Sequence, residues 1–555
     1  MSIEALDEND ENKSIKQLSG PALQWEKTAL FIVAGLVIVL CIYVRARLLG
    51  VPLERDEGEF AYIGQLMLKG IPPFSAAYSM KLPGVSGMYA VIMSLFGQTV
   101  QGIHLGLLVT NLATIFLLFL LGTRICDIRT GAVTSAVYAL LSASASVDGV
   151  FAHATHFVVL FAVAGYFCLF KAFDRDSRFL VLLSGLLFGM ALTMKQHAAL
   201  LIVFAFLYLV WRSRRRPASG QRQVMAEGAL FLLGASIPYT LIALWMVKAG
   251  SFDKYWFWTV QYAREYTSSE TLVVGLGRFF SQTAIIMRPQ LPLWLIAVAG
   301  GGLLATERGR SMDRFFIFGL TLFSLLAICP GFYFREHYYI MLLPATALLI
   351  GIAVQWAISW PAFSQHGFIR MIIPLFLFAG AVTYGLVSER GYFFSLPPER
   401  VSRTIYGANP FPEAVEIARY IREHTTTSDS IAVLGSEPEI YFYADRLSAT
   451  GHIYMYGLME NHPYAEQMQM QMIREIETAR PKYVVVVKVD VSWLVRPTSS
   501  QKVLDWGESY VRSLYDLVGV IDITGIYPTR YMWDDMAPGY APVSDKIVTV
   551  FKRRG

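Results

Sequence analysis

Long apolar runs, separated by short polar segments, occupy most of the first 390 residues of the chain. A hydrocarbon core about 30 Å thick needs about 20 mainly apolar residues per helix, and this window predicts about eleven spanning helices. Their centres are expected near residues 37, 113, 139, 163, 187, 204, 239, 294, 324, 349 and 379. The pattern predicts a polytopic α-helical membrane protein.

The pattern changes after residue 390. Segments 431–434 and 483–489 are rich in Val and Ile, which is typical of buried strands, whereas 412–423 and 465–479 have the spacing of amphipathic helices. Strands that alternate with helices predict a small α/β domain. The expected division is a polar tail over 1–24, a membrane part over 25–390 and an α/β domain over 391–555.

Composition agrees with a membrane protein, since 55% of residues are hydrophobic and only 16% are charged, against about 25% charged in soluble domains. The net charge of +5 comes from basic residues between the predicted spans and does not indicate nucleic-acid binding. The four cysteines lie in or beside apolar segments without metal-ligand spacing, so we expect neither disulfides nor cysteine chemistry.

The basic residues also predict the orientation of the chain. The acidic N-terminal tail lacks the basic segment and cleavage site of a secretory signal, so the first span should remain in the protein. With this tail in the cytoplasm, the inner segments carry clusters at 124–129, 171–178, 212–216 and 308–314, and Arg370, as the positive-inside rule requires. We therefore expect a multi-pass protein of the cell (inner or plasma) membrane with its C-terminal domain outside the cytoplasm.

Two adjacent carboxylates, Asp56 and Glu57, follow the first predicted span. Their surroundings are too polar for hydrocarbon, so they lie at the membrane–water boundary, where ionisable groups are functional candidates. A carboxylate there could act as a general base on a substrate whose lipid half is dissolved in the membrane. The alternative interpretation is the first turn of a helix, which acidic residues stabilise.

Cationic residues occur at three other predicted outer ends, namely Lys81, Lys195 with His197, and Arg335 with His337. Each of them could bind a phosphate group, for which the planar guanidinium of Arg335 is especially suited. The alternatives are a lysine that reaches the interface, the polar turn of a helical hairpin, and an interfacial aromatic belt with a local ion pair.

Asp148, His153 and His156 occupy the outer ends of the third and fourth predicted spans. The two histidines are three residues apart and could share a helix face on an acceptor or metal side of a site. A metal site lacks a third ligand here, and such histidines are commonly buried hydrogen-bonded residues. The sequence therefore requires no cofactor and defines no metal site.

Two segments resemble a known family. The run Arg55-Asp56-Glu57-Gly58-Glu59-Phe60-Ala61-Tyr62 precedes Gly70, Pro72-Pro73 and Lys81-Leu82-Pro83-Gly84, and a later turn reads Arg335-Glu336-His337-Tyr338-Tyr339 before Leu343-Pro344-Ala345. They resemble the first extracytoplasmic loop, and the segment before a late span, of the GT-C glycosyltransferases. The nearest branch is that of protein O-mannosyltransferases (dolichyl-phosphate-mannose-protein mannosyltransferases) and aminoarabinose transferases. The resemblance covers residues 25–390 and not the C-terminal domain.

The resemblance implies a membrane glycosyltransferase that moves a sugar from a polyprenyl-phosphate donor to a protein, lipid or glycan acceptor outside the cytoplasm. Asp56 would be the base, with Glu57 beside it and Arg55 helping to keep it ionised. Lys81, Lys195, Arg335 and His337 would hold the donor phosphate. Many relatives have a second acid at the start of the fourth span, where this chain reads Ala-His-Ala-Thr-His-Phe over 152–157. Either Asp148 takes that role or the second acid is absent.

The alternative function is a transporter or flippase for a lipid-linked or polar solute. Such a protein places ionisable groups near the middle of the membrane and often contains inverted repeats. Here the acidic residues lie at the predicted outer boundary, and no internal repeat is visible in the sequence.

Overall fold

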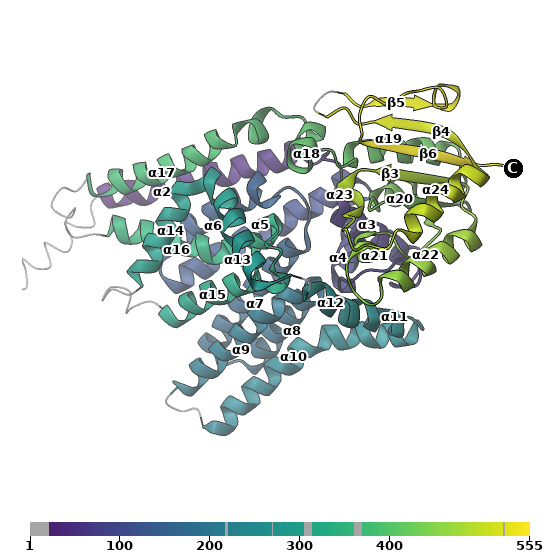
Figure 1. Cartoon of the computed structure of the whole chain (residues 1–555). Helices are drawn as coiled ribbons and strands as arrows, with labels where there is room; N and C mark the ends of the chain where they lie inside the picture. The colour runs from purple at the N-terminus through teal and green to yellow at the C-terminus, as the bar shows by residue number, and fades with distance from the viewer. Residues whose placement is uncertain (1–20, 217–219, 269, 305–312, 360–368, 526–527) are drawn as a thin grey trace, which may run out of the picture.

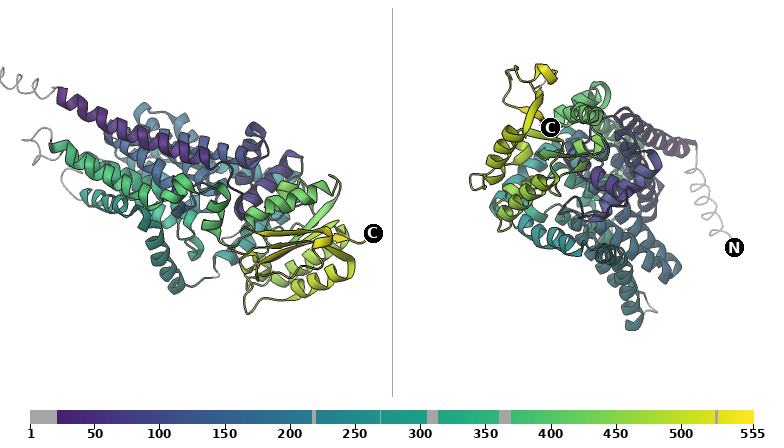
Figure 2. Two further views of the ribbon diagram at one scale, coloured as in Figure 1. Left: turned by 90° about the horizontal axis from the view of Figure 1, so that it is seen from above. Right: turned by 90° about the vertical axis from the view of Figure 1, so that its right-hand side faces the viewer.

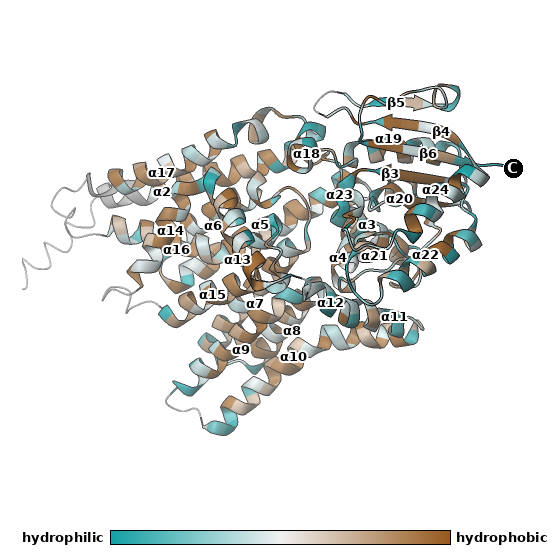
Figure 3. Ribbon diagram, in the orientation of Figure 1, coloured by the Kyte–Doolittle hydropathy of each residue, from teal (hydrophilic) through white to brown (hydrophobic). Residues whose placement is uncertain are grey.

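A bundle of long helices forms one part of the molecule, and a sheet with its own helices packs against one end of it (Figure 1). The computed structural model describes residues 21–216, 220–268, 270–304, 313–359, 369–525 and 528–555. The left-hand view of Figure 2 shows the sheet at the end of the bundle opposite to the start of α2. Figure 3 shows that apolar residues dominate the bundle, while hydrophilic residues are frequent in the α/β part.

Within the described residues, six helical segments are long and apolar enough to cross a membrane. They lie in α2 (Pro21–Arg47), α5 (Val100–Ile125), α7 (Ala154–Arg175), η2–α9 (Gln196–Ala198 and Ala199–Arg214), α10 (Gln221–Lys248), and α13–η4–α14 (Leu272–Met287, Arg288–Gln290 and Leu291–Leu303). Shorter apolar helices are α4 (Pro83–Phe96), α8 (Arg178–Met194), α15 (Arg314–Ala327), α16 (Leu343–Ile358) and α17 (Ile369–Ser388). With α6 (Ile128–Ala143), which is buried against α2, α5 and α16, these helices contain every predicted span centre. The polytopic fold is confirmed.

The structure corrects two boundaries. The aromatic-rich sequence over residues 250–282 predicts a long outer loop. In the structure α13 begins within it, at Leu272, where the Thr271 side chain accepts a hydrogen bond from the backbone N–H of Val274. The sequence over residues 85–96 predicts a short amphipathic stretch within the first outer loop, but these residues belong to the apolar helix α4. Residues 1–20 of the expected tail, and part of the 308–314 cluster, lie outside the described residues.

The segment between α10 and α13, the second outer segment, contains the short helices α11 (Phe252–Trp256), η3 (Phe257–Tyr262) and α12 (Ala263–Thr267). On the same side lie η1 (Ala145–Val147), η6 (Pro330–Phe332) and η7 (Glu336–Met341). α11 and α12 lie where the bundle meets the α/β part (Figure 1), η6 contacts α12, and η7 contacts η1.

The α/β part contains a six-stranded sheet in the order β2-β1-β3-β6-β4-β5. The strands are β1 (Ser430–Leu434), β2 (Leu447–Ser448), β3 (Tyr483–Lys488), β4 (Tyr515–Asp522), β5 (Arg530–Trp533) and β6 (Ile547–Arg553). β1 pairs in parallel with β2 and β3, whereas β6 is antiparallel to both β3 and β4. Its helices are η9 (Gly391–Ser395), α18 (Pro398–Tyr406), α19 (Phe411–Glu423), α20 (Glu439–Ala444), α21 (Tyr456–Met459), α22 (Ala465–Ala479), α23 (Asp490–Trp493), α24 (Lys502–Leu514) and η10 (Asp534–Met536). The predicted strands and helices of this part are confirmed.

The first loop is held between the bundle and the α/β part. Its helix α3 (Arg55–Leu68) packs against α20. At Gly58 an added Cβ would lie 2.6 Å from the backbone nitrogen of Glu439, so the two helices approach more closely than a side chain would allow. The backbone N–H of Ser448 also donates to the Tyr62 hydroxyl at 2.8 Å. The α/β part therefore contacts the loop that carries Asp56 directly.

We expect the α/β part to lie outside the cytoplasm, because arginines concentrate at the opposite helix ends. Alkaline phosphatase fused after Gly555 should be active, while the same reporter inserted between α9 and α10 should be inactive. Green fluorescent protein should be dark when it is fused after Gly555 and fluorescent when it is inserted between α9 and α10. Fluorescence of the fusion after Gly555 would contradict this orientation.

Candidate active site

The start of α3 places Asp56 at the edge of a cavity. Glu54 is the N-cap residue, and its carboxylate accepts a hydrogen bond from the backbone N–H of Glu57 at 2.8 Å. The Glu57 carboxylate accepts in return from the backbone N–H of Glu54 at 3.2 Å. This capping box fixes the first turn of the helix and leaves the intervening Asp56 facing the cavity.

Lys81 binds the Asp56 carboxylate. Its Nζ lies 2.8 Å from Oδ1 of Asp56 and 2.6 Å from Oε2 of Glu59, one helical turn further along α3. The ammonium also lies over the rings of Phe60 and Tyr454, 4.7 and 5.3 Å from their centroids. Lys81 is thus shared by two acids of the first loop.

Two further cations reach the same cavity from distant parts of the chain. Lys195 is the C-cap of α8, and its Nζ lies 4.0 Å from the ring centroid of Tyr338. Arg335 directly precedes η7. The cavity has a volume of about 540 Å³, and its polar wall includes Asp56, Glu59, Lys81, Lys195, Arg335, His337, Tyr338 and Tyr454. Together with Arg264, which also lines the cavity, four cations and two carboxylates face a space large enough for a small ligand.

The charges shift the ionisation of these groups. Burial alone would raise the pKa of the Asp56 carboxyl, but the positive charge of Lys81 holds it below its usual range. Burial lowers the pKa of the Lys195 ammonium to about 7, and Lys81 and Arg335 add to this shift against the opposing effect of Asp56. Asp56 is therefore ionised at neutral pH. An anion bound beside Lys195 would favour the protonated, positively charged form of Lys195.

Two histidines adjoin Asp56. The rings of His153 and His337 stack with their centroids 4.0 Å apart, and burial lowers the pKa of His153 to about 4, so it is neutral at physiological pH. Asp56, His153 and His337 each offer one ligand atom, and these atoms lie within 4.8 Å of one another. Among the residues that the structure describes, these three could hold a divalent cation here, although Lys81 already binds the Asp56 carboxylate.

Four predicted site residues do not line the cavity, namely Glu57, Asp148, His153 and His156. Glu57 is fully buried, and its Oε1 accepts a hydrogen bond from the backbone N–H of Ala152 at 2.5 Å and lies 3.0 Å from Nε2 of His104. This carboxylate links the first loop to α5 and the start of α7. Oδ2 of Asp148 lies 4.0 Å from Nδ1 of His337, but Asp148 itself is absent from the cavity lining. His156 is buried within α7 and does not join His153 in one set of ligands.

Sequence reasoning missed several lining residues. Glu59 stood in the acidic run but was not singled out, although its position one turn after Asp56 was a usable signal. Trp258 comes from the second outer segment, and His452, Tyr454 and Tyr456 come from the α/β part. The hydroxyl of Tyr454 lies 3.5 Å from Oδ1 of Asp56. The α/β part therefore forms a wall of the cavity.

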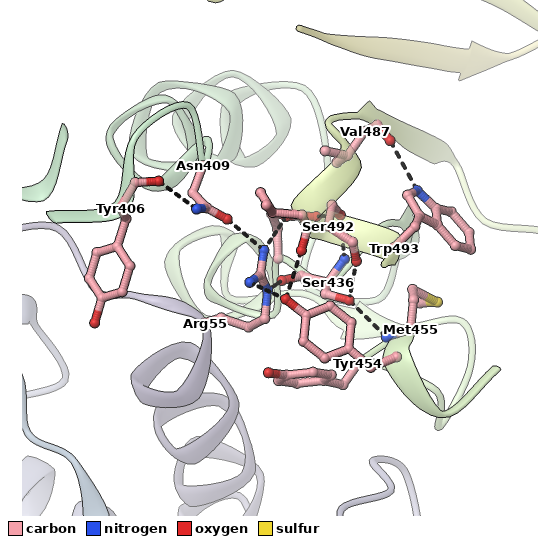
Figure 4. A network of polar contacts seen from close by, with 12 residues as sticks. Arg55, Tyr406, Asn409, Ser436, Tyr454, Met455, Val487, Ser492 and Trp493 are labelled. Carbon is pink, nitrogen blue, oxygen red and sulfur yellow. Dashed lines mark hydrogen bonds and ion pairs between the residues drawn. The ribbon is translucent and has the colours of Figure 1, made fainter. Parts of the chain in front are cut away.

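Arg55 anchors the first loop to the α/β part (Figure 4). Its Nε donates to the carbonyl of Ser436 at 2.6 Å, Nη1 to the Tyr456 hydroxyl at 2.6 Å, and Nη2 to Oδ1 of Asn409 at 2.9 Å. Nη2 also lies 3.2 Å from Oε1 of the fully buried Glu437. The expectation that Arg55 keeps Asp56 ionised is wrong, because its guanidinium is bound here and Lys81 pairs with Asp56.

A family model for dolichyl-phosphate-mannose-protein mannosyltransferases matches residues 81–245. A search of curated proteins gives no match. Among solved structures, the chain is similar to ArnT from Cupriavidus metallidurans bound to undecaprenyl phosphate, with 14% identity, a TM-score of 0.59 and coverage of 94% of this chain and 97% of ArnT.

It is also similar to the archaeal oligosaccharyltransferase AglB from Archaeoglobus fulgidus in complex with an inhibitory peptide and a dolichol-phosphate. The identity is 12%, the TM-score is 0.53, and the match covers 94% of this chain and 75% of AglB. The chain thus has the fold of GT-C membrane glycosyltransferases, and the resemblance drawn from the first loop is confirmed at that level.

Proposed function

We propose that this chain is an integral membrane glycosyltransferase that moves a sugar from a polyprenyl-phosphate donor to a protein, lipid or glycan acceptor outside the cytoplasm. The convergence of Asp56, Lys81, Lys195 and Arg335 on one cavity carries the proposal. The GT-C fold and the mannosyltransferase family model support it.

The chemistry needs one base and several cations. An acceptor hydroxyl attacks the anomeric carbon of the sugar from the face opposite the phosphate, and its proton passes to the Asp56 carboxylate. The bond between the anomeric carbon and the phosphate oxygen breaks, and the polyprenyl phosphate leaves with the bonding electrons. Lys81, Lys195 and Arg335 stabilise the charge that develops on it. A single displacement of this kind inverts the anomeric centre.

The shared position of Lys81 connects donor binding to the strength of the base. With Lys81 bound, Asp56 is ionised but is a weak proton acceptor, because its pKa is lowered. A donor phosphate competes for the Lys81 ammonium, which raises the pKa of the freed carboxylate. Asp56 thereby becomes a stronger base when the donor is in place.

Sugar transfer by the purified protein is the direct test of this proposal. Mass spectrometry of glycans, glycolipids and glycoproteins from cells with and without the gene identifies the missing sugar and acceptor. The matching polyprenyl-phosphate sugar is then supplied to the full-length protein with that acceptor. Transfer that Asp56→Asn abolishes supports the proposal, whereas unchanged glycans together with no transfer would overturn it.

Arg335→Ala is expected to weaken donor turnover by an order of magnitude or more, since a charge-assisted hydrogen bond contributes about 1.5–3 kcal/mol. Arg278→Ala is the matched control, because Arg278 also lies over the Tyr333 ring, at 5.7 Å against 5.6 Å for Arg335, but does not line the cavity. Initial rates measured against donor concentration should fall for Arg335→Ala and stay at the wild-type level for Arg278→Ala. Full activity of both Arg335→Ala and Lys81→Ala would remove these residues from the mechanism.

A further inference from the structure

A second cavity, of about 710 Å³, lies at the end of the bundle away from the α/β part. Arginines from three helices line it, with Arg124 near the end of α5, Arg212 near the end of α9 followed by Arg215, and Arg314 at the start of α15. The charge pattern of the chain predicts that this end faces the cytoplasm. None of these residues belongs to the candidate active site.

The lining carries an excess of positive charge. Arg124, Arg212 and Arg215 alone outnumber the one lining carboxylate, that of Asp313. This carboxylate already accepts hydrogen bonds from the backbone N–H of Phe316, at 3.1 Å, and from the Tyr208 hydroxyl. Arg124 additionally pairs with Asp174, which lies outside the lining. The cavity therefore favours a ligand with negative charge, and phosphate oxygens match the geometry of arginine.

Aromatic rings form one rim of the cavity. Trp211 stacks on Phe315 with centroids 4.4 Å apart, and the Arg215 guanidinium lies 4.5 Å from the Trp211 centroid. Phe318 is 64% exposed although it is apolar and lies on a helix of the bundle. From this rim an exposed apolar stripe continues along α15 through Phe315, Phe318, Leu322 and Leu325. Their spacing places them on one helix face.

The stripe and the arginines together match the two halves of a phospholipid. A soluble phosphate would satisfy the guanidinium groups but would leave the stripe without a role. Acyl chains along α15 would cover the stripe while the headgroup lies among the arginines at the level where basic pockets between helices bind anionic lipids. We propose that this cavity binds the phosphate headgroup of an anionic phospholipid of the cytoplasmic leaflet.

Binding is measured on the full-length protein in detergent, by native mass spectrometry and by thermal stabilisation, during titration with phosphatidylglycerol, cardiolipin or zwitterionic phosphatidylethanolamine. We expect the anionic lipids to bind at least about tenfold more tightly, as for charge-assisted contacts. Separate titrations with inorganic phosphate and pyrophosphate measure whether a soluble phosphate stabilises the protein as lipid does. Equal binding of all three lipids, or stabilisation by phosphate alone equal to that by lipid, would overturn the proposal.

Paired substitutions locate the site. Arg212→Gln with Arg215→Gln should abolish the preference for anionic lipid, whereas Arg214→Gln with Arg178→Gln, which removes two arginines outside the lining, should preserve it. Arg212→Lys with Arg215→Lys keeps the charge that orients the chain and loses the planar fork, so it should bind anionic lipid with reduced affinity. Equal loss of preference in the lining and control pairs would show a general charge effect and overturn the assignment.

Discussion

Asp56→Asn should lower sugar transfer by about 10²-fold or more, the size expected when a general base is removed. The amide preserves the shape of the side chain but cannot accept a proton. It also weakens the contact with Lys81, whose Nζ lies 2.8 Å from Oδ1. Initial rates with a polyprenyl-phosphate sugar, at matched protein concentration and saturating donor, measure the effect on the chemical step.

Asp445→Asn is a matched control for that experiment. Asp445 also pairs with a lysine near α3, since its Oδ1 lies 2.5 Å from Nζ of Lys69, but it does not line the cavity. Its activity should equal that of the wild type. If Asp56→Asn turns over normally while folded and inserted, Asp56 is not the base, whatever the remaining residues do.

Arg55→Met is expected to destabilise the protein by about 3–5 kcal/mol, because it leaves a buried carboxylate without its cation. Glu437 is fully buried, and Arg55 also binds Ser436, Asn409 and Tyr456. The variant should show a lower Tm in detergent, and protease should release the α/β part at a lower concentration. Protease cleavage sites on α20 and α21, next to Arg55, should become accessible first.

Lys69→Met provides the comparison, since the Lys69–Asp445 pair joins the same two parts but is exposed to solvent. Such a pair contributes about 0–1 kcal/mol. Adding Glu437→Gln to Arg55→Met should recover part of the lost stability, because the second change removes the uncompensated charge. Melting of Arg55→Met at the wild-type temperature would contradict the role assigned to this cluster.

The spans and the main elements of the sheet could be predicted because each has a local signal. The helix α22 and the strands β1 and β3 match their sequence patterns closely. The start of α13 was missed because its signal is a single capping residue, Thr271, within a region rich in aromatic residues. Composition over a wide window does not resolve such a boundary.

The site was predictable only in part. Asp56, Lys81, Lys195 and Arg335 were found because charged residues at the ends of apolar spans stand out locally. Their mutual contacts depend on packing between distant segments, and no local pattern encodes that Tyr454 approaches Asp56 across a separation of 398 residues. The burial of Glu57 away from the cavity was not predicted for the same reason, because its partner His104 lies 47 residues away.

The close contact between α3 and α20 limits how this protein can diverge by recombination. A side chain at Gly58 would meet the backbone of Glu439 at 2.6 Å, and Arg55 needs Ser436 and Glu437 in place from the other part. A C-terminal part taken from a distant homologue would lack the residues that fit Gly58 and bind Arg55 of this first loop. Chimeras should therefore function only when both segments are inherited from the same parent, so the two parts evolve as one unit.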